Sequence, residues 1–279
     1  MTEHRVPESV GAMPLPRYLA RAWPLLPGWA LRQAVKKRDI RLNGLRWDGA
    51  APVRGGDILA LFLPDKYLTG PLEVLYRDED FLGVVKPPAL PVDADAQGIG
   101  ADTLLERARR IEPGARLCHR LDAGTGGAML LALNDRAQAR LDAAFRAHQV
   151  RKTYQAVVQG APPSHGELTH YLVKDAAAAR VRALDRPAPQ AQQARLRYAV
   201  LAYGDQRALV QIQLLTGRTH QIRVQMAKIG HPLLGDDKYG DRAFNKRWKA
   251  KEPLLWCVAL EWENIALNAP APFGWKEEN

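Results

Sequence analysis

The chain has 279 residues, 47% of them hydrophobic, and its 40 lysines and arginines against 30 acidic residues give a formal charge of +10. This length and apolar content support one large domain, or a large and a small one, and the positive charge favours RNA, DNA or an acidic membrane as partner. Two distant cysteines exclude a disulfide framework and a Cys-x-x-Cys metal site. No segment has the pattern of a signal peptide or a membrane span, so we expect a soluble, cytoplasmic protein without membrane association.

The first third of the chain predicts a tail followed by a small domain. Residues 1–16 contain three prolines and no clear period, which predicts a flexible N-terminal tail. Within residues 17–64 we expect a helix from Arg17, a second helix over residues 29–37 and a strand over residues 58–63. Asn43-Gly44 between alternating apolar residues is a strong hairpin signal. Five cations share one expected face: Arg32, Lys36, Lys37, Arg38 and Arg41. They could contact phosphates, or simply form a solvated helix face.

Residues 65–72 read as a linker, and residues 73–268 as a second, larger domain with a tail over residues 269–279. Strands are expected over residues 73–76, 81–85, 152–159, 196–202, 208–215 and 254–262. Helices are expected over residues 103–111, capped by Asp102, after the cap Asn134, and over residues 219–229. Residues 174–195 read as an irregular surface excursion without a function. Strands with a few helices in no regular alternation predict an α+β fold.

One acidic residue stands out at the centre of the chain. The stretch L-C-H-R-L-D-A-G-T-G-G-A-M-L-L-A over residues 117–132 places Asp122 before a loop of small residues and then an apolar run that suits a buried strand. Asp122 therefore sits on a tight turn at the mouth of a packed core, with a guanidinium two residues away. Such a carboxylate could be a nucleophile, a general base, a metal ligand or the partner of a neighbouring arginine.

Two further motifs narrow these alternatives. Residues 214–239 read L-L-T-G-R-T-H-Q-I-R-V-Q-M-A-K-I-G-H-P-L-L-G-D-D-K-Y, and residues 151–154 read R-K-T-Y. Together with H-R-L-D-x-x-T, this ordered set resembles the RluA family of RNA pseudouridine synthases over residues 17–262. The sequence D-D-K-Y-G-D-R-A-F at residues 236–244 is similar to the C-type large-subunit ribosomal branch of that family.

The resemblance implies a fold and a reaction. The expected fold is a pseudouridine synthase domain with a central mixed, largely antiparallel sheet. A small RNA-binding domain similar to that of ribosomal small-subunit protein four would precede it. The reaction would be isomerisation of uridine to pseudouridine in RNA, expected to be large-subunit rRNA. It needs no cofactor and no metal, and we expect a monomer.

The resemblance also implies roles for individual residues. Asp122 would be the nucleophile, either attacking the anomeric carbon or taking a ribose proton to form a glycal. Arg218 would pair with this acid, and Tyr154 would stack on the uracil and relay the proton from carbon-5. The target nucleotide must leave its stack, and Arg120 would fill the vacated space while His119 supports the loop. Thr219, Gln221 and Arg223 would position the loop or the RNA backbone.

The chain departs from the family pattern at three places, and two alternatives remain. Gly126 stands where serine is usual, Gln225 where histidine is usual, and Trp256-Cys257 where His-Ala is expected. These departures motivate the alternative of a catalytically inactive RNA-binding ribosome-assembly factor. A further alternative groups four side chains as a metal site for phosphodiester hydrolysis: His231, Asp236, Asp237 and Asp241.

Overall fold

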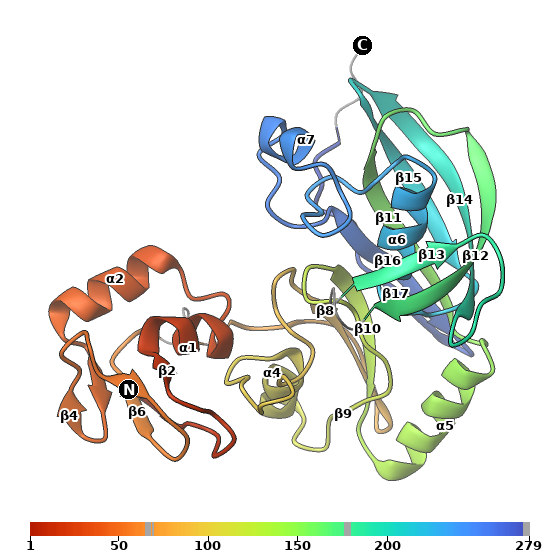
Figure 1. Ribbon diagram of the computed structural model, residues 1–279. Coiled ribbons are helices and arrows are strands. Elements are labelled where there is room, and N and C mark those ends of the chain that lie inside the picture. Colours follow the sequence, from red (N-terminus) through yellow and green to blue (C-terminus); the bar gives the residue numbers. More distant parts are fainter. Residues whose placement is uncertain (65–67, 69, 176–179, 276–279) are drawn as a thin grey trace. The chain divides into compact units, whose positions relative to one another are not determined.

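The chain folds into two compact units in a computed structural model that describes residues 1–64, 68, 70–175 and 180–275 (Figure 1). The smaller unit comprises Met1–Leu72 and Ala89–Ala115, and the larger one comprises Glu73–Pro88 and the chain from Arg116 onward. The sequence predicts a single boundary within residues 65–72. The structure differs, because residues 89–115 pack with the N-terminal residues. None of the helices in these described residues is long and apolar enough to cross a membrane.

The smaller unit contains a four-stranded sheet in the order β1-β6-β3-β4, with helices around it. Helix α1 buries Tyr18 and Leu19 in a core with Leu59 and Leu61 of β6. The predicted hairpin is confirmed, since β3 and β4 pair across a two-residue turn that begins at Asn43, with φ of 51°. The elements are β1 (Thr2–Arg5), β2 (Met13–Pro14), α1 (Leu15–Ala22), α2 (Gly28–Lys37), β3 (Ile40–Leu42), β4 (Leu45–Arg46), β5 (Pro52–Val53), β6 (Ile58–Leu61) and α4 (Leu104–Ile111).

The N-terminal residues are not the flexible tail that the sequence predicts. Strand β1 pairs antiparallel with β6 over four residues, and Val6 and Val10 are buried in the core of this unit. Without β1, the edge of β6 would present unpaired backbone groups to solvent. The prolines that suggested a tail lie outside β1, where they do not interrupt the pairing.

Polar contacts hold the segment 89–115 together and join it to the rest of the smaller unit. Helix α4 is capped by Thr103, whose hydroxyl accepts from the Glu106 N–H, and not by Asp102 as predicted. Asp102 instead holds Arg107 through two hydrogen bonds of 2.7 Å, with both side chains buried. A second ion pair joins Arg21 to Asp95 at 2.6 Å.

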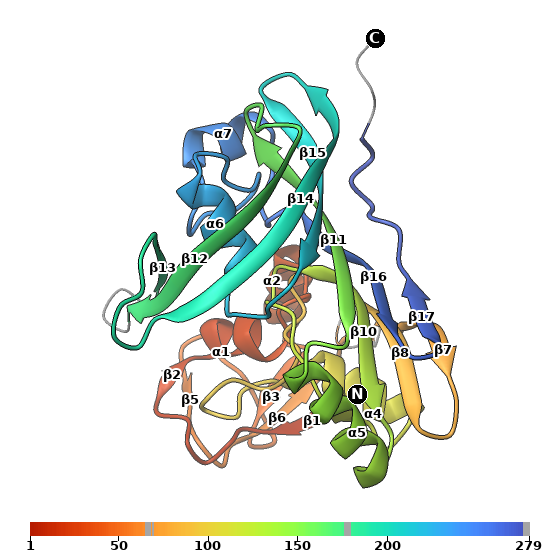
Figure 2. The same ribbon diagram turned by 90° about the vertical axis from the view of Figure 1, so that its right-hand side faces the viewer.

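The larger unit is built on an eleven-stranded sheet in the order β13-β12-β14-β15-β11-β16-β10-β8-β7, with β17 on β16 and β9 on β10 (Figure 2). Neighbouring strands pair antiparallel except β10 and β16, which are parallel. The predicted α+β fold with a mixed, largely antiparallel sheet is confirmed. The strands are β7 (Glu73–Arg77), β8 (Phe81–Lys86), β9 (Arg116–Leu117), β10 (Gly126–Ala132), β11 (Arg151–Gln159), β12 (His165–Asp175), β13 (Arg180–Leu184), β14 (Gln192–Gly204), β15 (Arg207–Leu214), β16 (Leu255–Trp262) and β17 (Ile265–Asn268).

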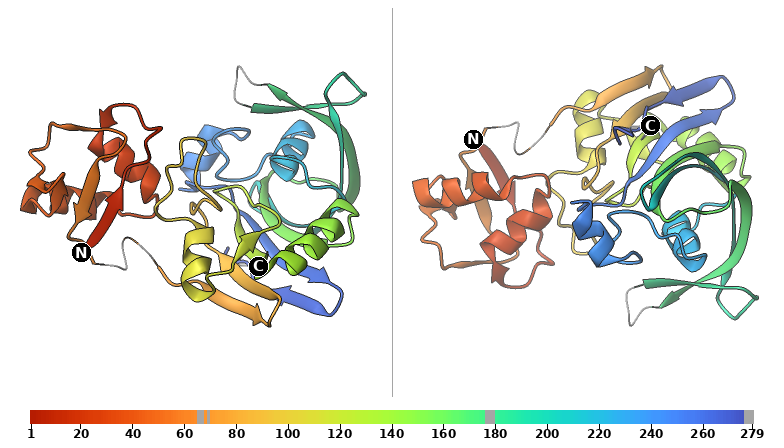
Figure 3. Two further views of the ribbon diagram at one scale, coloured as in Figure 1. Left: turned by 90° about the horizontal axis from the view of Figure 1, so that it is seen from below. Right: turned by 90° about the horizontal axis from the view of Figure 1, so that it is seen from above.

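In the described part of the larger unit, three helices accompany this sheet: α5 (Asp135–Arg146), α6 (Gln221–Lys228) and α7 (Arg242–Arg247). All seven residues of β10 are buried, as its apolar run predicts, and α5 packs against it. The predicted cap of α5 is confirmed, because Asn134 accepts from the Ala137 N–H at 2.9 Å. The strands at the β13 end of the sheet curve toward α6, and Val224 of α6 packs with Leu172 of β12 (Figure 3).

Two segments differ from the sequence prediction. Residues 174–195, predicted to be irregular, contain the end of β12, all of β13 and the start of β14; residues 176–179 lie outside the described part. The described part of the predicted C-terminal tail packs against the larger unit. There, Phe273 and Trp275 join an apolar cluster and the Arg207 guanidinium lies 4.9 Å from the Trp275 ring centroid.

Candidate active site

The turn between β9 and β10 carries Asp122. The Thr125 N–H donates to the Asp122 carbonyl at 3.0 Å, which closes the turn, and the Asp122 side chain is 28% exposed. Leu121 and Thr125 are buried on either side. The small residues that follow Asp122 therefore let the chain enter the buried strand β10 while one carboxylate stays accessible.

The buried side chain of Lys86 supports this turn. Lys86, at the end of β8, has no exposed surface, and its ammonium donates to the carbonyls of Pro87 and Ala123 at 2.9 Å each. Burial lowers the pKa of Lys86 to about 7, against the opposing effect of the Asp122 and Glu252 charges. The backbone directly after Asp122 is thus fixed to the sheet.

Arg223 of α6 joins Asp122 to a second carboxylate. Its guanidinium donates to Asp236 from Nε at 2.7 Å and from a terminal nitrogen at 2.8 Å, and to Asp122 from the other terminal nitrogen at 3.4 Å. Burial would raise the pKa of Asp236, but the Arg223 hydrogen bonds and two backbone N–H groups outweigh it and hold that pKa below its usual value. The planar guanidinium is therefore oriented by the buried Asp236 and presents its remaining donor to Asp122.

His220 also lies close to the Asp122 carboxylate. It has a left-handed backbone, with φ of 54°, immediately before α6, and its Nε2 lies 3.9 Å from the Asp122 carboxylate. Its Nδ1 is 2.7 Å from the Tyr239 hydroxyl. Burial lowers the pKa of His220, while the Asp122 charge opposes that shift. Asp122 thus faces one fixed cation and one imidazole.

Tyr154 lies on β11, where it pairs with Cys257 of β16, the strand next to β10. The side chain is 5% exposed. Burial, followed by the neighbouring Cys257 and Asp122, raises the pKa of Tyr154 well above its usual value, so the phenol is protonated at neutral pH. The Asp122 charge contributes to this shift, so these two predicted residues lie within electrostatic range of each other.

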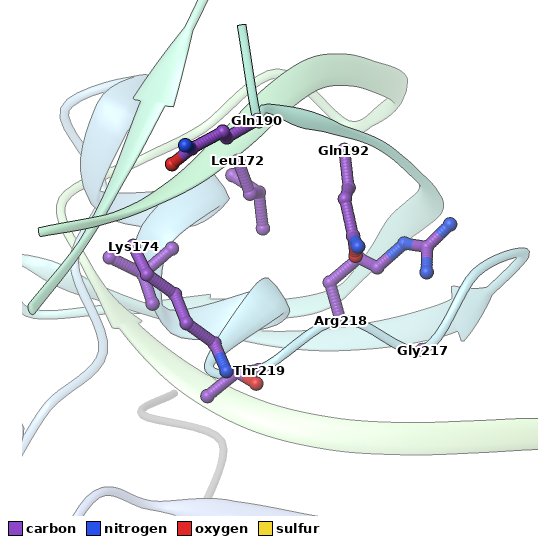
Figure 4. A pocket seen from close by; sticks show the side chains of 8 residues that line it. Leu172, Lys174, Gln190, Gln192, Gly217, Arg218 and Thr219 are labelled. Atoms are coloured by element: carbon purple, nitrogen blue, oxygen red, sulfur yellow. The ribbon is translucent and has the colours of Figure 1, made fainter.

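Arg218 is not the partner of Asp122. Its Nε donates to the Gln193 carbonyl at 3.2 Å, and no ion pair joins it to Asp122 within the described residues. Arg218 instead lines a pocket with Thr219 and strands β12 and β13 (Figure 4). Arg223, five residues later in the same motif, holds the position predicted for Arg218. The sequence carries two arginines in T-G-R-T-H-Q-I-R, and only the register of α6 decides which one reaches the acid.

The remaining predicted residues divide into buried and exposed groups. His119 accepts from the Leu130 N–H at 3.2 Å, and burial lowers its pKa to about 3, so it is a neutral structural residue that supports the loop. Gln221 is buried, and its amide oxygen accepts from the Thr216 hydroxyl and the Arg218 N–H. Arg120 and Thr219 are exposed.

The cations predicted to bind RNA in the smaller unit are all exposed. They lie on α2 and at its end, and on β3: Arg32, Lys36, Lys37, Arg38 and Arg41. The Arg41 guanidinium lies 5.1 Å from the centroid of the partly exposed Phe62 ring. The structure thus presents five exposed positive charges, and one of them, Arg41, lies beside an aromatic side chain.

Two of the three departures from the family pattern are coupled. Gly126 and Gly127 of β10 pair in parallel with Trp256 and Cys257 of β16. A Cβ atom on Gly126 would overlap the Trp256 ring, and Gly127 has φ of 112° with the Cys257 backbone against it. The tryptophan therefore fills the space that a larger residue at position 126 would need. Within the described residues, neither Gly126 nor Trp256 makes a hydrogen bond to the Asp122 side chain.

The third departure, Gln225, is a fully buried residue of α6. Its amide nitrogen lies 3.1 Å from His170 Nδ1 and donates to the carbonyls of Leu168 and Ala194. Within the described residues its amide oxygen has no hydrogen-bond partner. Gln225 thus joins α6 to β12 and β14 and does not face Asp122.

The four side chains of the metal alternative do not form a cluster. His231 lies 2.9 Å from the Gln159 carbonyl, Asp236 is held by Arg223, and Asp241 caps α7. In the described ranges, no group of three or more His, Cys, Asp or Glu side chains could hold a metal ion. Each of these residues has a structural partner instead.

Comparison with known proteins identifies relatives along most of the chain. A family model described as RNA pseudouridylate synthase matches residues 80–228. An uncharacterised RNA pseudouridine synthase of Chloroflexus aurantiacus is 33% identical over 254 residues, 85% of this chain and 78% of that protein. Ribosomal large subunit pseudouridine synthase C of Vibrio parahaemolyticus is 29% identical over 260 residues, 86% of this chain and 80% of its own length. Human RNA pseudouridylate synthase domain containing 1 is a structural neighbour with a TM-score of 0.63 and 29% identity, covering 72% of this chain and 84% of that one.

Proposed function

Because the chain belongs to the RNA pseudouridylate synthase family, we propose that Asp122 is the carboxylate that reacts with the nucleoside as uridine in RNA is isomerised to pseudouridine. The observation that carries this proposal is the partly exposed Asp122 carboxylate, which accepts a hydrogen bond from Arg223 at 3.4 Å and whose charge acts on the buried Tyr154. The residues matched by the family model include all three. A carboxylate at position 122 beside a fixed guanidinium suits both proposed first steps, attack on the anomeric carbon and removal of a ribose proton.

The reaction conserves atoms and needs no second substrate. The bond between the anomeric carbon and N1 of uracil breaks, the base turns, and the same anomeric carbon bonds to carbon-5. The proton on carbon-5 is lost and N1 gains one. No oxidant, reductant or second substrate enters this balance, so the residues around Asp122 have to stabilise charge, hold the base and move protons.

We assign Tyr154 to holding the uracil. The raised pKa of Tyr154 keeps the phenol protonated, which disfavours it as the base that takes the carbon-5 proton. Its ring, on a rigid strand beside Asp122, can stack on the detached base. His220, 3.9 Å from Asp122, is placed to receive a proton from the acid or the ribose.

We propose RNA of the large ribosomal subunit as the substrate. Relatives that carry this in their names match over more than four fifths of the chain. The exposed cations of the smaller unit, together with Phe62, support a nucleic-acid contact in which each neutralised phosphate strengthens binding. We propose that this unit is an RNA-binding domain of the ribosomal small-subunit protein four type, and that the protein acts in the cytoplasm.

The inactive assembly factor is the weaker alternative. It is motivated by Gly126, Gln225 and Trp256. However, the Trp256 ring fills the space beside Gly126, and the Gln225 amide donates a hydrogen bond to the Ala194 carbonyl of β14. None of them displaces Asp122, Tyr154 or Arg223.

Tritium release tests the proposal. A transcript of large-subunit rRNA labelled with tritium on carbon-5 of uridine should lose tritium to water with the wild-type chain and not with Asp122→Asn, which keeps the side-chain shape and removes the charge. Asp205→Asn, which breaks an exposed ion pair with Arg247, is the matched control and should retain activity. Equal release by wild type and Asp122→Asn would refute the proposal.

A further inference from the structure

A pocket beside the Asp122 site has no role in the proposed reaction. It has a volume of about 320 Å³ and lies between strands β12, β13 and β14 and the loop that carries Arg218. Its place in the fold follows from strand register. Leu172 of β12 pairs with Gln192 of β14, and Lys174 of β12 pairs with Val181 of β13. Directly opposite residues, and residues two apart on one strand, share a face, so these four side chains gather on one side of the sheet.

The pocket combines an apolar floor with a rim of polar side chains that make few hydrogen bonds within the described part of the chain. Leu172 and Val181 are buried, at 5% and 7% exposure, and form the floor. Lys174 and Gln190 lie on one side of the opening in Figure 4, and Gln192 and Arg218 lie on the other. Within the part of the chain that the structure describes, the Lys174 ammonium and the two glutamine amides make no side-chain hydrogen bond, and Arg218 uses only its Nε. The rim therefore presents two cations and two amides to a ligand.

These groups match the chemistry of a single nucleotide. An apolar floor suits the face of a planar base, and glutamine amides supply both a donor and an acceptor for a base edge. Lysine and arginine suit the phosphate. A volume of about 320 Å³ lies at the lower end of the usual range for ligand pockets, which limits the occupant to a small molecule or one residue of a polymer.

The pocket is joined to the Asp122 site through one side chain. The Tyr239 hydroxyl accepts from the Val181 N–H at 3.0 Å and lies 2.7 Å from His220 Nδ1. His220 in turn lies 3.9 Å from the Asp122 carboxylate. Val181 forms part of the pocket floor, and His220 faces the reacting carboxylate. The Tyr239 side chain therefore connects the pocket to the site of the target uridine.

We propose that this pocket binds an unpaired nucleotide of the substrate RNA that flanks the target uridine; this inference rests on the proposed function. The base lies on Leu172 and Val181, the amides of Gln190 and Gln192 contact its edge, and Lys174 and Arg218 contact its phosphate. The pocket thereby selects targets in single-stranded loops, where a neighbouring base is free to leave its stack.

Binding of an unmodified large-subunit rRNA transcript tests the proposal on the full chain. The double substitution Gln190→Leu and Gln192→Leu should weaken binding about tenfold, in the range expected for losing the hydrogen bonds to one base edge. Gln211→Leu is the matched control, because Gln211 is an exposed glutamine on β15 outside the pocket. Tritium release at saturating RNA should stay within about twofold of wild type for both, so the loss appears in KM.

Ultraviolet crosslinking of the same transcript to the wild-type chain gives a direct readout. Crosslinked peptides should include the strands around Leu172 and Val181 as well as the strand with Tyr154. Equal affinity of the double variant and the Gln211→Leu control, with no crosslink in β12 or β13, would overturn the proposal. A wild-type chain that crosslinks through the pocket but releases no tritium would refute the proposed function and support the pocket.

Free nucleotides form a separate arm. Uridine and adenosine monophosphates should not compete with the transcript for the wild-type chain, because the RNA backbone on both sides of the bound nucleotide supplies part of the affinity. A different result would contradict the assignment to RNA: the wild-type chain binds a monophosphate, the double variant does not, and both have the same affinity for the transcript. The pocket would then be a site for free nucleotides.

Discussion

Replacing Arg223 with glutamine separates two roles of that guanidinium. In the folded chain it is 12% exposed, makes two short hydrogen bonds to the fully buried Asp236, and reaches Asp122 at 3.4 Å. Arg223→Gln leaves the Asp236 carboxylate buried without a cation, which should lower the free energy of unfolding by about 3 kcal/mol. It also removes a preorganised donor from Asp122, which should lower kcat by about a hundredfold.

A second substitution tells these effects apart. In the double variant Arg223→Gln with Asp236→Asn, the buried site is neutral, so most of the stability should return in urea unfolding. Turnover in the tritium assay should stay low, because Asp122 still lacks its guanidinium. Recovery of kcat together with stability would refute the reasoning, since Arg223 would then act only by holding α6 in place.

The buried pair of Arg107 and Asp102 is the matched control. It is a two-bond ion pair with both distances at 2.7 Å and both side chains buried, but it lies in the smaller unit. Arg107→Gln should lower the free energy of unfolding by a similar amount of about 3 kcal/mol. The kcat of the folded fraction should be unchanged at saturating RNA.

Three further predictions concern packing, pH and salt. Gly126→Ser should destabilise the fold by about 1 to 3 kcal/mol in urea unfolding because it meets the Trp256 ring, and Trp256→His in the same chain should restore most of the loss; additive losses would contradict the coupling. Burial lowers the pKa of Lys86 to about 7, so above pH 7 the unfolded chain binds a proton that the folded chain does not. The free energy of unfolding of wild type relative to Lys86→Met should therefore rise by up to about 1.4 kcal/mol per pH unit between pH 7 and 10, and a difference that does not change with pH would contradict the lowered pKa of Lys86. Lys36→Ala with Lys37→Ala should reduce the slope of log affinity against log salt by roughly 1 to 2, and an unchanged slope would show that the smaller unit does not bind phosphates.

The sequence is informative where local rules decide the structure. The Asn43-Gly44 turn, the Asn134 cap and the buried strand β10 follow from backbone and capping preferences that act over a few residues. Asp122 was identified because its motif joins an accessible acid to a buried strand. The mixed sheet followed from the resemblance to the family and from the irregular order of strands and helices.

The sequence is less informative where distant segments meet. The arginine that reaches Asp122 is set by the orientation of α6 and by Asp236, thirteen residues further along the chain. The motif resemblance, which implies Arg218 as the partner of the acid, does not contain this information. The return of residues 89–115 to the smaller unit depends on partners far away in sequence, such as Arg21 for Asp95. Strand β13 is short, and its nearby prolines obscure its alternation, so the pocket it lines was not predicted.

Mapping of pseudouridines in cellular RNA is the most direct test of the central claim. Ribosomal RNA from cells that lack this protein should miss at least one pseudouridine that wild-type cells contain, and the wild-type chain should restore it while Asp122→Asn should not. Restoration of the modification by Asp122→Asn, or an identical map with and without the protein, would contradict the account.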